Sequence, residues 1–428
     1  MNGMHETIYP RLGERVLRRT MPNGLELCIV PKAGYRKKYA FFVTHYGGMD
    51  MKFRRGGVLY DTPAGIAHYL EHKMFDTAEG NALQELSQNG AEPNAFTSNA
   101  ITAYYFDCTE HFAENLRILL SFVSVPYFTD ESVEKERGII GQEIRMVEDT
   151  PDWMVYTKLM ECLYRTSPAR VAIAGTVESI SGITAQTLYD CHKAFYNPAN
   201  MMLCVVGDVD ADEVAALADE ILPSEPGEVI ERVYGEESDM RAAQPSSSLE
   251  MEVAMPQFLV GFKCETAEGG KELLRQDLIG SLACDVLLSE STPLYSRLYD
   301  AGLINSSFSG GFDQLPGVAY LCAGGESDDP QAVSDAILAE AQRLAREGID
   351  EQFYQQIRRA SVGASISALN SFENIAVDMA DGYFRGFDPY RFPEVYDSIT
   401  KADLEEFLRR CVTAERRALS VVVPKQEA

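Results

Sequence analysis

The second half of the chain repeats the order of secondary structure that its first half predicts. In each half a strand pair precedes a helical stretch, further strands follow, and two amphipathic helices come after them. The halves match most closely where residues 129–144 correspond, at an offset of 220 residues, to the segment that begins at residue 349 and runs to 366. At 428 residues the chain is also too long for one ordinary hydrophobic core. We therefore expect an α+β protein of two homologous α/β sandwich units, each an antiparallel sheet backed by helices.

The first half predicts a series of strands and helices. Two apolar runs joined by a turn, at residues 25–34 and 37–48, predict a pair of neighbouring strands. A helix should follow over residues 62–76, with Thr62 as its N-cap and Pro63 at its first helical position. The remaining expected elements are strands at 94–108 and 201–210 and helices at 79–91, 110–126, 130–149, 181–196 and 211–222.

The boundary between the two copies falls in an aperiodic stretch. Residues 223–248 are acidic, contain proline and serine, and show neither helical nor strand periodicity. Such a composition is typical of a linker between domains. We therefore expect one domain at residues 1–225 and its homologue at residues 240–428.

Charge and cysteine content narrow the class of function. The chain carries 65 acidic and 38 basic residues, a net charge of −27, which argues against nucleic acid and anionic membranes as partners. Its nine cysteines are scattered and form no Cys-x-x-Cys pair, so we interpret them as reduced core residues. The sequence contains neither an apolar signal segment at its start nor a run long enough to span a membrane. We expect a cytoplasmic protein.

The segment HYLEH, residues 68–72, places two histidines four residues apart beside a glutamate. On a helix, His68 and His72 project from one face, so both imidazoles can reach one metal ion. A catalytic zinc keeps one coordination position for water and therefore needs three protein ligands. One further ligand is then required from elsewhere in the chain. An ordinary surface helix that carries these residues by chance is the alternative.

Two glutamates of a later helix are the best candidates for the missing ligand. Glu136 and Glu143 are seven residues apart in EKERGIIGQEIRM, so they project from nearly the same side of a helix. Ile140 and Ile144 share that side, which indicates that it is buried. Buried carboxylates without partners are unfavourable, and a cation would neutralise them. We choose Glu143 as the third ligand and Glu136 as a carboxylate that supports a ligand or contacts substrate. A solvated acidic helix face is the alternative.

Glu71 has a different expected role. It cannot easily bind the same ion as its flanking histidines, but its carboxylate can take a proton from a water activated by zinc and deliver it to a leaving amine. These residues predict metal-assisted amide hydrolysis with one zinc ion per chain. Glu71 and Glu136 are the expected catalytic residues.

These motifs resemble a known family. His-x-x-Glu-His followed by Glu-x6-Glu is similar to the inverted zincins of the pitrilysin or insulinase-like family, which includes the mitochondrial processing peptidases. The chain is most similar to a bacterial subgroup of about its own length that is linked to aminopentanol modification of elongation factor P, a link that no residue supports. Segments that resemble the family, in the family's order, are GIAHYLEHKMF, NGAEPNAFTSNAITAYYF, EKERGIIGQEIRM, IAGTVESISGIT and FYNPANMMLCVVGDVD.

The resemblance implies a zinc metalloendopeptidase with a fold like that of the processing peptidases and S-ribosylhomocysteine lyase. Residues 1–225 would carry the zinc, and residues 240–428 would form an inactive homologue that closes a substrate chamber admitting unfolded peptides. The implied residues are His68, His72 and Glu143 as zinc ligands, Glu71 as base, Glu136 as auxiliary glutamate, and Asn94 and Ala95 as the segment that pairs with substrate backbone.

One departure from the family concerns an arginine and a tyrosine that often contact the bound peptide in the second half. Leu298 and Asn305 stand at those places, and the adjacent Arg297 fits a surface helix charge equally well. The chain therefore lacks part of this substrate clamp. The resemblance implies a homodimer, or a heterodimer with a homologous chain that lacks the metal.

Two alternatives to a peptidase follow. The first is a non-catalytic or partner-dependent subunit of a processing peptidase complex, which the missing arginine and tyrosine favour. The intact set of His68, Glu71, His72 and Glu143 argues against it, because a subunit without catalysis has no chemical need for all four. The second is a different metalloenzyme, because S-ribosylhomocysteine lyase carries the same histidine motif. Two repeats and Glu143 argue against that enzyme.

Overall fold

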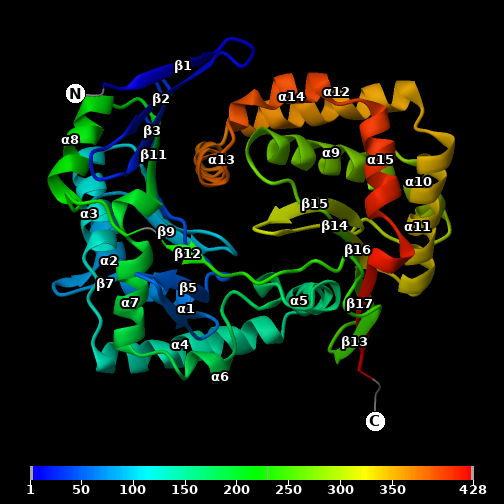
Figure 1. Ribbon diagram of the computed structural model, residues 1–428, viewed down its shortest axis with the longest axis horizontal. Helices are drawn as coiled ribbons and strands as arrows, with labels where there is room; N and C mark the ends of the chain where they lie inside the picture. The colour runs from blue at the N-terminus through cyan, green and yellow to red at the C-terminus, as the bar shows by residue number, and fades with distance from the viewer. Residues whose placement is uncertain (1–2, 229, 426–428) are drawn as a thin grey trace. The chain divides into compact units, whose positions relative to one another are not determined.

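The computed structural model describes residues 3–228 and 230–425 (Figure 1). It confirms an α+β protein in which helices cover mixed sheets. The chain divides into two compact units, each made of several segments. Unit 1 runs up to Ile144 and adds residues 172–234 and 366–384. Unit 2 holds residues 145–171 and 235–365 and everything described from Arg385 on.

Unit 1 is built on a seven-stranded sheet with the order β1-β2-β3-β11-β4-β10-β9. Strand β11 pairs in parallel with β3 and antiparallel with β4, so the two runs expected to be neighbours are separated by it. The run expected as one strand at 94–108 is a hairpin of two. The strands are β1 (His5–Tyr9), β2 (Glu14–Thr20), β3 (Glu26–Pro31), β4 (Lys38–Thr44), β9 (Glu92–Thr97), β10 (Thr102–Cys108) and β11 (Met201–Gly207).

One face of this sheet is covered by helices from the first half of the chain. Leu27, Phe42 and Leu203 point into that core together with apolar residues of the covering helices. The helices of this part are α1 (Ile66–Met74), α2 (Ala82–Gln88), α3 (Phe112–Ser124), α4 (Asp130–Glu148), α6 (Val177–Ile180), α7 (Ala185–Phe195) and α8 (Ala211–Ile221). Between α1 and α2, the two-residue strands β7 (Asp76–Thr77) and β8 (Gly80–Asn81) pair with each other.

The opposite face of the same sheet is covered by a helix from the second half, α13 (Phe372–Arg385). The ring of His45, just after β4, stacks on Phe384 with centroids 4.7 Å apart. Arg18 of β2 donates to the sulfur of Met379 at 3.1 Å. Phe41, on this face of β4, is fully buried. The sheet of unit 1 is therefore buried on both sides.

Unit 2 repeats the topology of unit 1. Its five strands have the order β13-β17-β14-β16-β15, in which β13 and β17 pair in parallel and all other neighbours are antiparallel. The five strands β3-β11-β4-β10-β9 of unit 1 follow the same order and directions. This agreement confirms two homologous units. The strands of unit 2 are β13 (Ser246–Met251), β14 (Gln257–Cys264), β15 (Ser309–Leu315), β16 (Val318–Glu326) and β17 (Arg417–Pro424).

Helices also cover both faces of the sheet in unit 2. A side chain at Gly261 of β14 would lie 2.9 Å from Leu159 of α5, whereas Phe312, on the other face, packs against Gly280 of α9. The helices are α5 (Pro151–Leu163), α9 (Gly270–Leu288), α10 (Pro293–Asp300), α11 (Pro330–Glu347), α12 (Glu351–Ala368), α14 (Phe392–Ser398) and α15 (Lys401–Cys411). Short 3-10 helices are η1 (Pro168–Arg170), η2 (Pro198–Asn200), η3 (Pro389–Arg391) and η4 (Ala414–Arg416).

Helices α5 and α13 occupy equivalent places in the two repeats, and each belongs to the compact unit of the other half. Helix α5 follows α4 and packs on the sheet of unit 2. Helix α13 follows α12 and belongs to unit 1. The compact units therefore differ from the continuous ranges 1–225 and 240–428 that the sequence suggested. The reason is that each sheet needs a second covering helix, and the helix comes from the other repeat.

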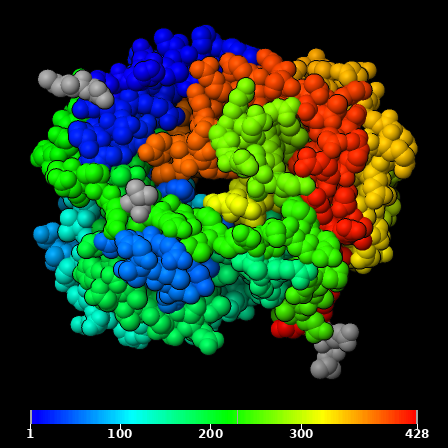
Figure 2. Space-filling model, viewed as in Figure 1, coloured from blue at the N-terminus to red at the C-terminus, as the bar shows by residue number. Residues whose placement is uncertain are grey.

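The segment expected to be an aperiodic linker is held in place at two points, residues 231–234 and Glu237. Its first part forms β12 (Glu231–Arg232), which pairs with the hairpin β5 (Lys52–Arg55) and β6 (Val58–Asp61), seen in blue on the surface in Figure 2. The Tyr234 hydroxyl donates to the buried carboxylate of Asp50 at 2.7 Å. From Gly235 to Ser365 the chain belongs to unit 2.

The second anchor of this segment is a buried ion pair. Glu237 Oε1 lies 2.6 Å from Lys263 Nζ, and the two side chains are 6% and 2% exposed. Glu237 also accepts hydrogen bonds from the backbone amides of Arg165, Thr166 and Ser167. Burial alone would raise the pKa of Glu237, but the bonds from Lys263, Thr166 and Arg165 outweigh it and hold the pKa at about 2.

Two further observations concern the whole chain. All nine cysteines are free, eight of them are buried and Cys322 is half-buried, which agrees with their interpretation as reduced core residues. Within the described residues, no helix combines the length and the hydropathy that crossing a bilayer requires.

We expect Glu237→Gln to lower the free energy of unfolding at pH 7 by about 3 kcal/mol, because it leaves the buried Lys263 ammonium without its counter-charge. Chemical denaturation followed by circular dichroism measures this. Glu220→Gln is the matched control, since Glu220 pairs with Arg117 in an exposed position and its loss should change little.

The same pair predicts a pH dependence. The folded pKa of Glu237 lies below its ordinary value of 4.5, so its contribution is fully present above that pH and is lost as pH falls toward 2. The stability difference between wild type and Glu237→Gln should therefore shrink between pH 5 and about pH 2. A difference that stays constant over this range would contradict the assignment.

Candidate metal centre

Helix α1 begins three residues later than the sequence predicts. Gly65 has a φ of 92°, in the left-handed region that only glycine adopts easily, so the helix starts at Ile66. The expected roles of Thr62 as N-cap and Pro63 as first helical residue are therefore wrong. The helix itself, and the placing of the HYLEH segment on it, agree with the prediction.

The start of α1 is held by a close crossing of two loops. A Cβ on Gly65 would lie 2.4 Å from the carbonyl oxygen of Ala174, and a Cβ on Gly175 would lie 2.4 Å from that of Ala64. Both glycines have positive φ. The Ser179 hydroxyl donates to Ala64 O at 2.8 Å and closes the crossing. Two glycines therefore let the loop before α6 fix the first residues of the histidine helix.

The two histidines of α1 face the helix α4, which lies beside it (Figure 1). Their ring centroids are 4.6 Å apart. The side chains of His68 and His72 are 13% and 26% exposed, so both are shielded but reachable. The Tyr69 hydroxyl, next to His68 on α1, donates to Val133 O of α4 and ties the two helices together.

Two carboxylates of α4 meet these imidazoles. Glu143 Oε1 lies 3.5 Å from His68 Nε2, and Glu143 Oε2 lies 3.5 Å from His72 Nε2. Glu136 Oε1 lies 3.0 Å from the other ring nitrogen of His72, Nδ1. The structure thus brings together all four residues that the sequence selected for this purpose. One carboxylate faces both Nε2 atoms, and the other holds the far side of one ring.

The geometry fits a zinc ion. His68, His72 and Glu143 each offer a ligand atom, and these atoms lie within 4.8 Å of one another. Zinc with tetrahedral bonds of about 2.0–2.1 Å separates neighbouring ligand atoms by roughly 3.4 Å, close to the observed separations of 3.5 Å. The contact of His72 Nδ1 with Glu136 is the carboxylate support typical of metal-bound imidazole. In the described part of the chain this is the only group with such spacing.

Electrostatics also favour a cation between these groups. Burial alone would lower the pKa of His72, but the bond to Glu136 and the charges of Glu71 and Glu143 raise it above its ordinary value. The hydrogen bond from His68 lowers the pKa of Glu143 despite partial burial, and the charges of both imidazoles add to this effect. A histidine must be neutral to bind metal, so protons and a metal ion compete for the same negative surroundings.

Glu71 lies on α1 directly before His72. It is 7% exposed, and its Oε2 accepts a hydrogen bond of 2.7 Å from the hydroxyl of Thr97, the last residue of β9. Sequence reasoning missed Thr97. The available signal was strand alternation, which places Thr97 and its cross-strand partner Thr102 on one face of the β9–β10 hairpin.

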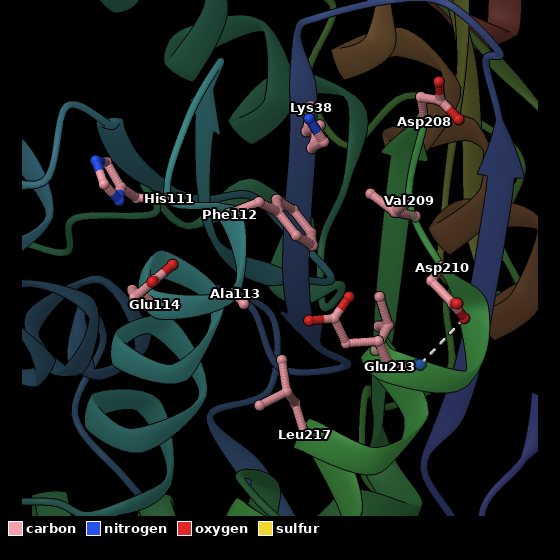
Figure 3. Close-up of a pocket in the computed structure, with 11 residues that line it drawn as sticks. Lys38, His111, Phe112, Ala113, Glu114, Asp208, Val209, Asp210, Glu213 and Leu217 are labelled. Carbon is pink, nitrogen blue, oxygen red and sulfur yellow. Dashed lines mark hydrogen bonds between the residues drawn. The ribbon is translucent and has the colours of Figure 1, made fainter.

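A cavity of about 340 Å³ lies elsewhere in unit 1 (Figure 3). It is formed at the N-terminal ends of α3 and α8, with Lys38 of β4 at its wall. Lys38 pairs with Cys108 at one end of the β4–β10 ladder, whereas Thr44 and Thr102 mark the other end, near Glu71. Seven paired residues span roughly 20 Å, so this cavity is separate from the histidines.

The comparisons with known proteins agree with these motifs. Residues 55–177 match the family described as "Insulinase (Peptidase family M16)", and residues 182–361 match "Peptidase M16 inactive domain". A Bacillus subtilis protein named as an uncharacterized zinc protease, YmfH, is 37% identical over 422 residues, which covers 97% of this chain and 98% of that protein. The chain belongs to peptidase family M16. This is the pitrilysin or insulinase-like family whose motifs the sequence resembles.

Solved structures of M16 proteins share the fold. An M16-like peptidase from Alicyclobacillus acidocaldarius is 33% identical, with a TM-score of 0.92 over 96% of this chain and 99% of that one. Pitrilysin is 17% identical, with a TM-score of 0.77, and the chain matches 47% of its length. At that identity the likeness to pitrilysin shows the fold alone.

Asn94 and Ala95 lie on β9, the edge strand of the large sheet. Asn94 is exposed, and its side-chain oxygen accepts a hydrogen bond of 2.9 Å from the amide of Ala95. Ala95 shares a face with Thr97 because side chains alternate along a strand. The expected contact of this segment with substrate backbone stays a prediction.

Leu298, Asn305 and Arg297, the positions compared with the substrate clamp of the family, are engaged within the chain. Leu298 is 4% exposed and belongs to the core of unit 2. The amide of Asn305 donates to Glu326 Oε2 at 2.8 Å, and Arg297 donates to Glu340 Oε2 at 3.0 Å. Arg297 is therefore committed to an ion pair on its own unit, which agrees with the simpler interpretation as a surface helix charge.

We expect Glu136→Gln to weaken zinc binding about 10- to 100-fold at pH 7, because it removes the charge that supports His72 and keeps the size of the side chain. Competition with a chromogenic chelator measures the affinity. Glu131→Gln, an exposed position in the first turn of the same helix, is the control and should bind as wild type does. Equal affinity of Glu136→Gln and wild type would remove Glu136 from the site.

The loop crossing gives a second expectation. Gly175→Ala places a Cβ against Ala64 O at a φ of 70°, so it should lower the free energy of unfolding by about 2–4 kcal/mol and weaken zinc binding with it. Gly138→Ala, on an open side of α4, should instead raise stability by about 0.5–1 kcal/mol. Chemical denaturation measures the free energy of unfolding of both variants. A Gly175→Ala protein as stable as wild type would contradict the close crossing of the two loops.

Proposed function

We propose that this chain is a zinc-dependent endopeptidase that hydrolyses peptide bonds of unfolded peptides. The observation that carries the proposal is the meeting of His68, His72 and Glu143 around one point, with Glu71 beside them, in a member of family M16. A zinc site at these residues is consistent with the name of the related YmfH protein, a zinc protease. Each residue then has a separate task.

His68, His72 and Glu143 would hold the ion, and Glu136 would fix the ring of His72 through Nδ1. Zinc, when bound, would act as a Lewis acid that polarises the scissile carbonyl and lowers the pKa of a water molecule. Glu71 takes the proton of the attacking water on Oε1, since its Oε2 is bonded to Thr97, and delivers that proton to the leaving amine nitrogen.

Substrate selection by backbone is supported by the position of β9. An extended peptide can add to the free edge of this strand through main-chain hydrogen bonds, with little demand on its sequence. Folded proteins do not offer such a segment, so unfolded peptides are the proposed substrate class. Free, mostly buried cysteines support our further proposal of a reducing cytoplasmic location.

A second candidate function is that of a subunit that cleaves only with a partner. It is favoured by Leu298 and Asn305, which offer no guanidinium or phenol for a bound peptide, and by the family match described as an inactive domain. In this reading the chain forms a heterodimer with a homologous chain that lacks the metal, or pairs with itself.

The test incubates zinc-loaded wild type and Glu71→Gln with a mixture of unstructured peptides and identifies products by mass spectrometry. We expect wild type to cleave and Glu71→Gln to bind one zinc yet lose about 10²- to 10⁴-fold in kcat, because the variant cannot accept the proton. Glu143→Ala should lose the metal. Glu79→Gln, an exposed glutamate after α1, is the control.

Two outcomes would overturn parts of the proposal. Equal cleavage by wild type and Glu71→Gln would exclude Glu71 as the base. Zinc-loaded wild type that cleaves nothing alone, but does so after a homologous chain is added, would establish the second candidate instead. Retention of zinc by Glu143→Ala would exclude Glu143 as a ligand.

A further inference from the structure

The carboxylate of Glu71 is held on one side only. Its Oε2 accepts the Thr97 hydroxyl at 2.7 Å, and within residues 3–228 and 230–425 this is the hydrogen bond that its side chain makes. The bond joins a neutral donor to an ionised acceptor, which makes it stronger than a bond between neutral groups. A carboxylate rotates easily about its last torsion, so one fixed oxygen determines where the other oxygen points.

Thr97 is itself fixed by the sheet. It ends β9 and pairs across the hairpin with Thr102, which is fully buried. The Thr102 hydroxyl lies 3.3 Å from Thr97 Oγ1 and 2.9 Å from Tyr46 O. Since this hydroxyl has one proton, it donates to one of these oxygens at a time. The tight turn that follows is closed by a bond of 2.8 Å from Ser98 N to Ile101 O.

We infer that Thr97 is a positioning residue that holds Glu71 in register with the edge strand β9. This inference rests on the proposed function, in which β9 receives the substrate backbone and Glu71 moves the proton. One strand then does both tasks: its edge would align the peptide, and its last side chain aims the base at that peptide. The hydroxyl is required, whereas the methyl group of Thr97 is not.

The test compares Thr97→Val, which keeps the shape and removes the hydroxyl, with Thr97→Ser, which keeps the hydroxyl. We expect kcat to fall about 10- to 100-fold in Thr97→Val with KM changed less than about threefold, because the lost bond is to a charged group. Thr97→Ser should restore most of the rate. Zinc content and the melting temperature should match wild type in both.

The matched control is Thr20→Val. Thr20 also donates to a buried carboxylate, Glu26 Oε2 at 3.0 Å, but far along the sheet on β2 and β3. It should leave kcat unchanged. A Thr97→Val enzyme with wild-type kcat, while Glu71→Gln is inactive, would overturn the inference and leave the proposed function intact.

A second measurement does not depend on activity. Crystal structures of zinc-loaded wild type, Thr97→Val and Thr97→Ser report the rotamer of Glu71 directly. We expect Glu71 to occupy one conformation in wild type and Thr97→Ser and to leave it in Thr97→Val. An unchanged Glu71 in Thr97→Val would overturn the inference even if wild type proves inactive on peptides, an outcome that would count against the proposed function alone.

Discussion

Strand β11 has no polar side, and much of the architecture follows from the need to cover it. All its residues are buried, and side chains of a strand alternate between faces, so both faces of the sheet must be shielded from water. Helices of the first half shield one face, and α13 shields the other. The second sheet obtains the same cover from α5. Exchange of equivalent helices between repeats thus satisfies two burial requirements at once.

Packing against the covered sheet also determines where the histidines of α1 and the glutamates of α4 lie. Helix α1 packs its apolar side into the core of unit 1, which leaves His68 and His72 facing α4 and its glutamates. Partly buried carboxylates are unfavourable unless a cation or donor neutralises them. Glu136 and Glu143 share the imidazoles, and Glu71 receives a hydroxyl from the sheet. Core packing and site electrostatics therefore depend on the same helix.

Local patterns predicted which side chains would lie together because their spacing falls within single helices. The four-residue step from His68 to His72 fixes one helical face, and an apolar stripe around Glu143 marks another as buried. Non-local features escaped prediction. The runs at 25–34 and 37–48 fit a hairpin equally well, and only tertiary packing inserts β11 between them. The contact of Thr97 with Glu71 likewise depends on how a hairpin meets a helix.

Helix exchange has a consequence for synthesis on the ribosome. Strand β11 completes the centre of the first sheet at Gly207, yet α13 ends about 180 residues later. At a synthesis rate of roughly 5–20 residues per second, roughly 10–35 s pass between the synthesis of β11 and that of α13, which covers one apolar face of the sheet. During this interval the nascent chain exposes Phe41 and its neighbours and is vulnerable to aggregation. A chain truncated before residue 366 would lack α13, the helix of the second half that belongs to unit 1.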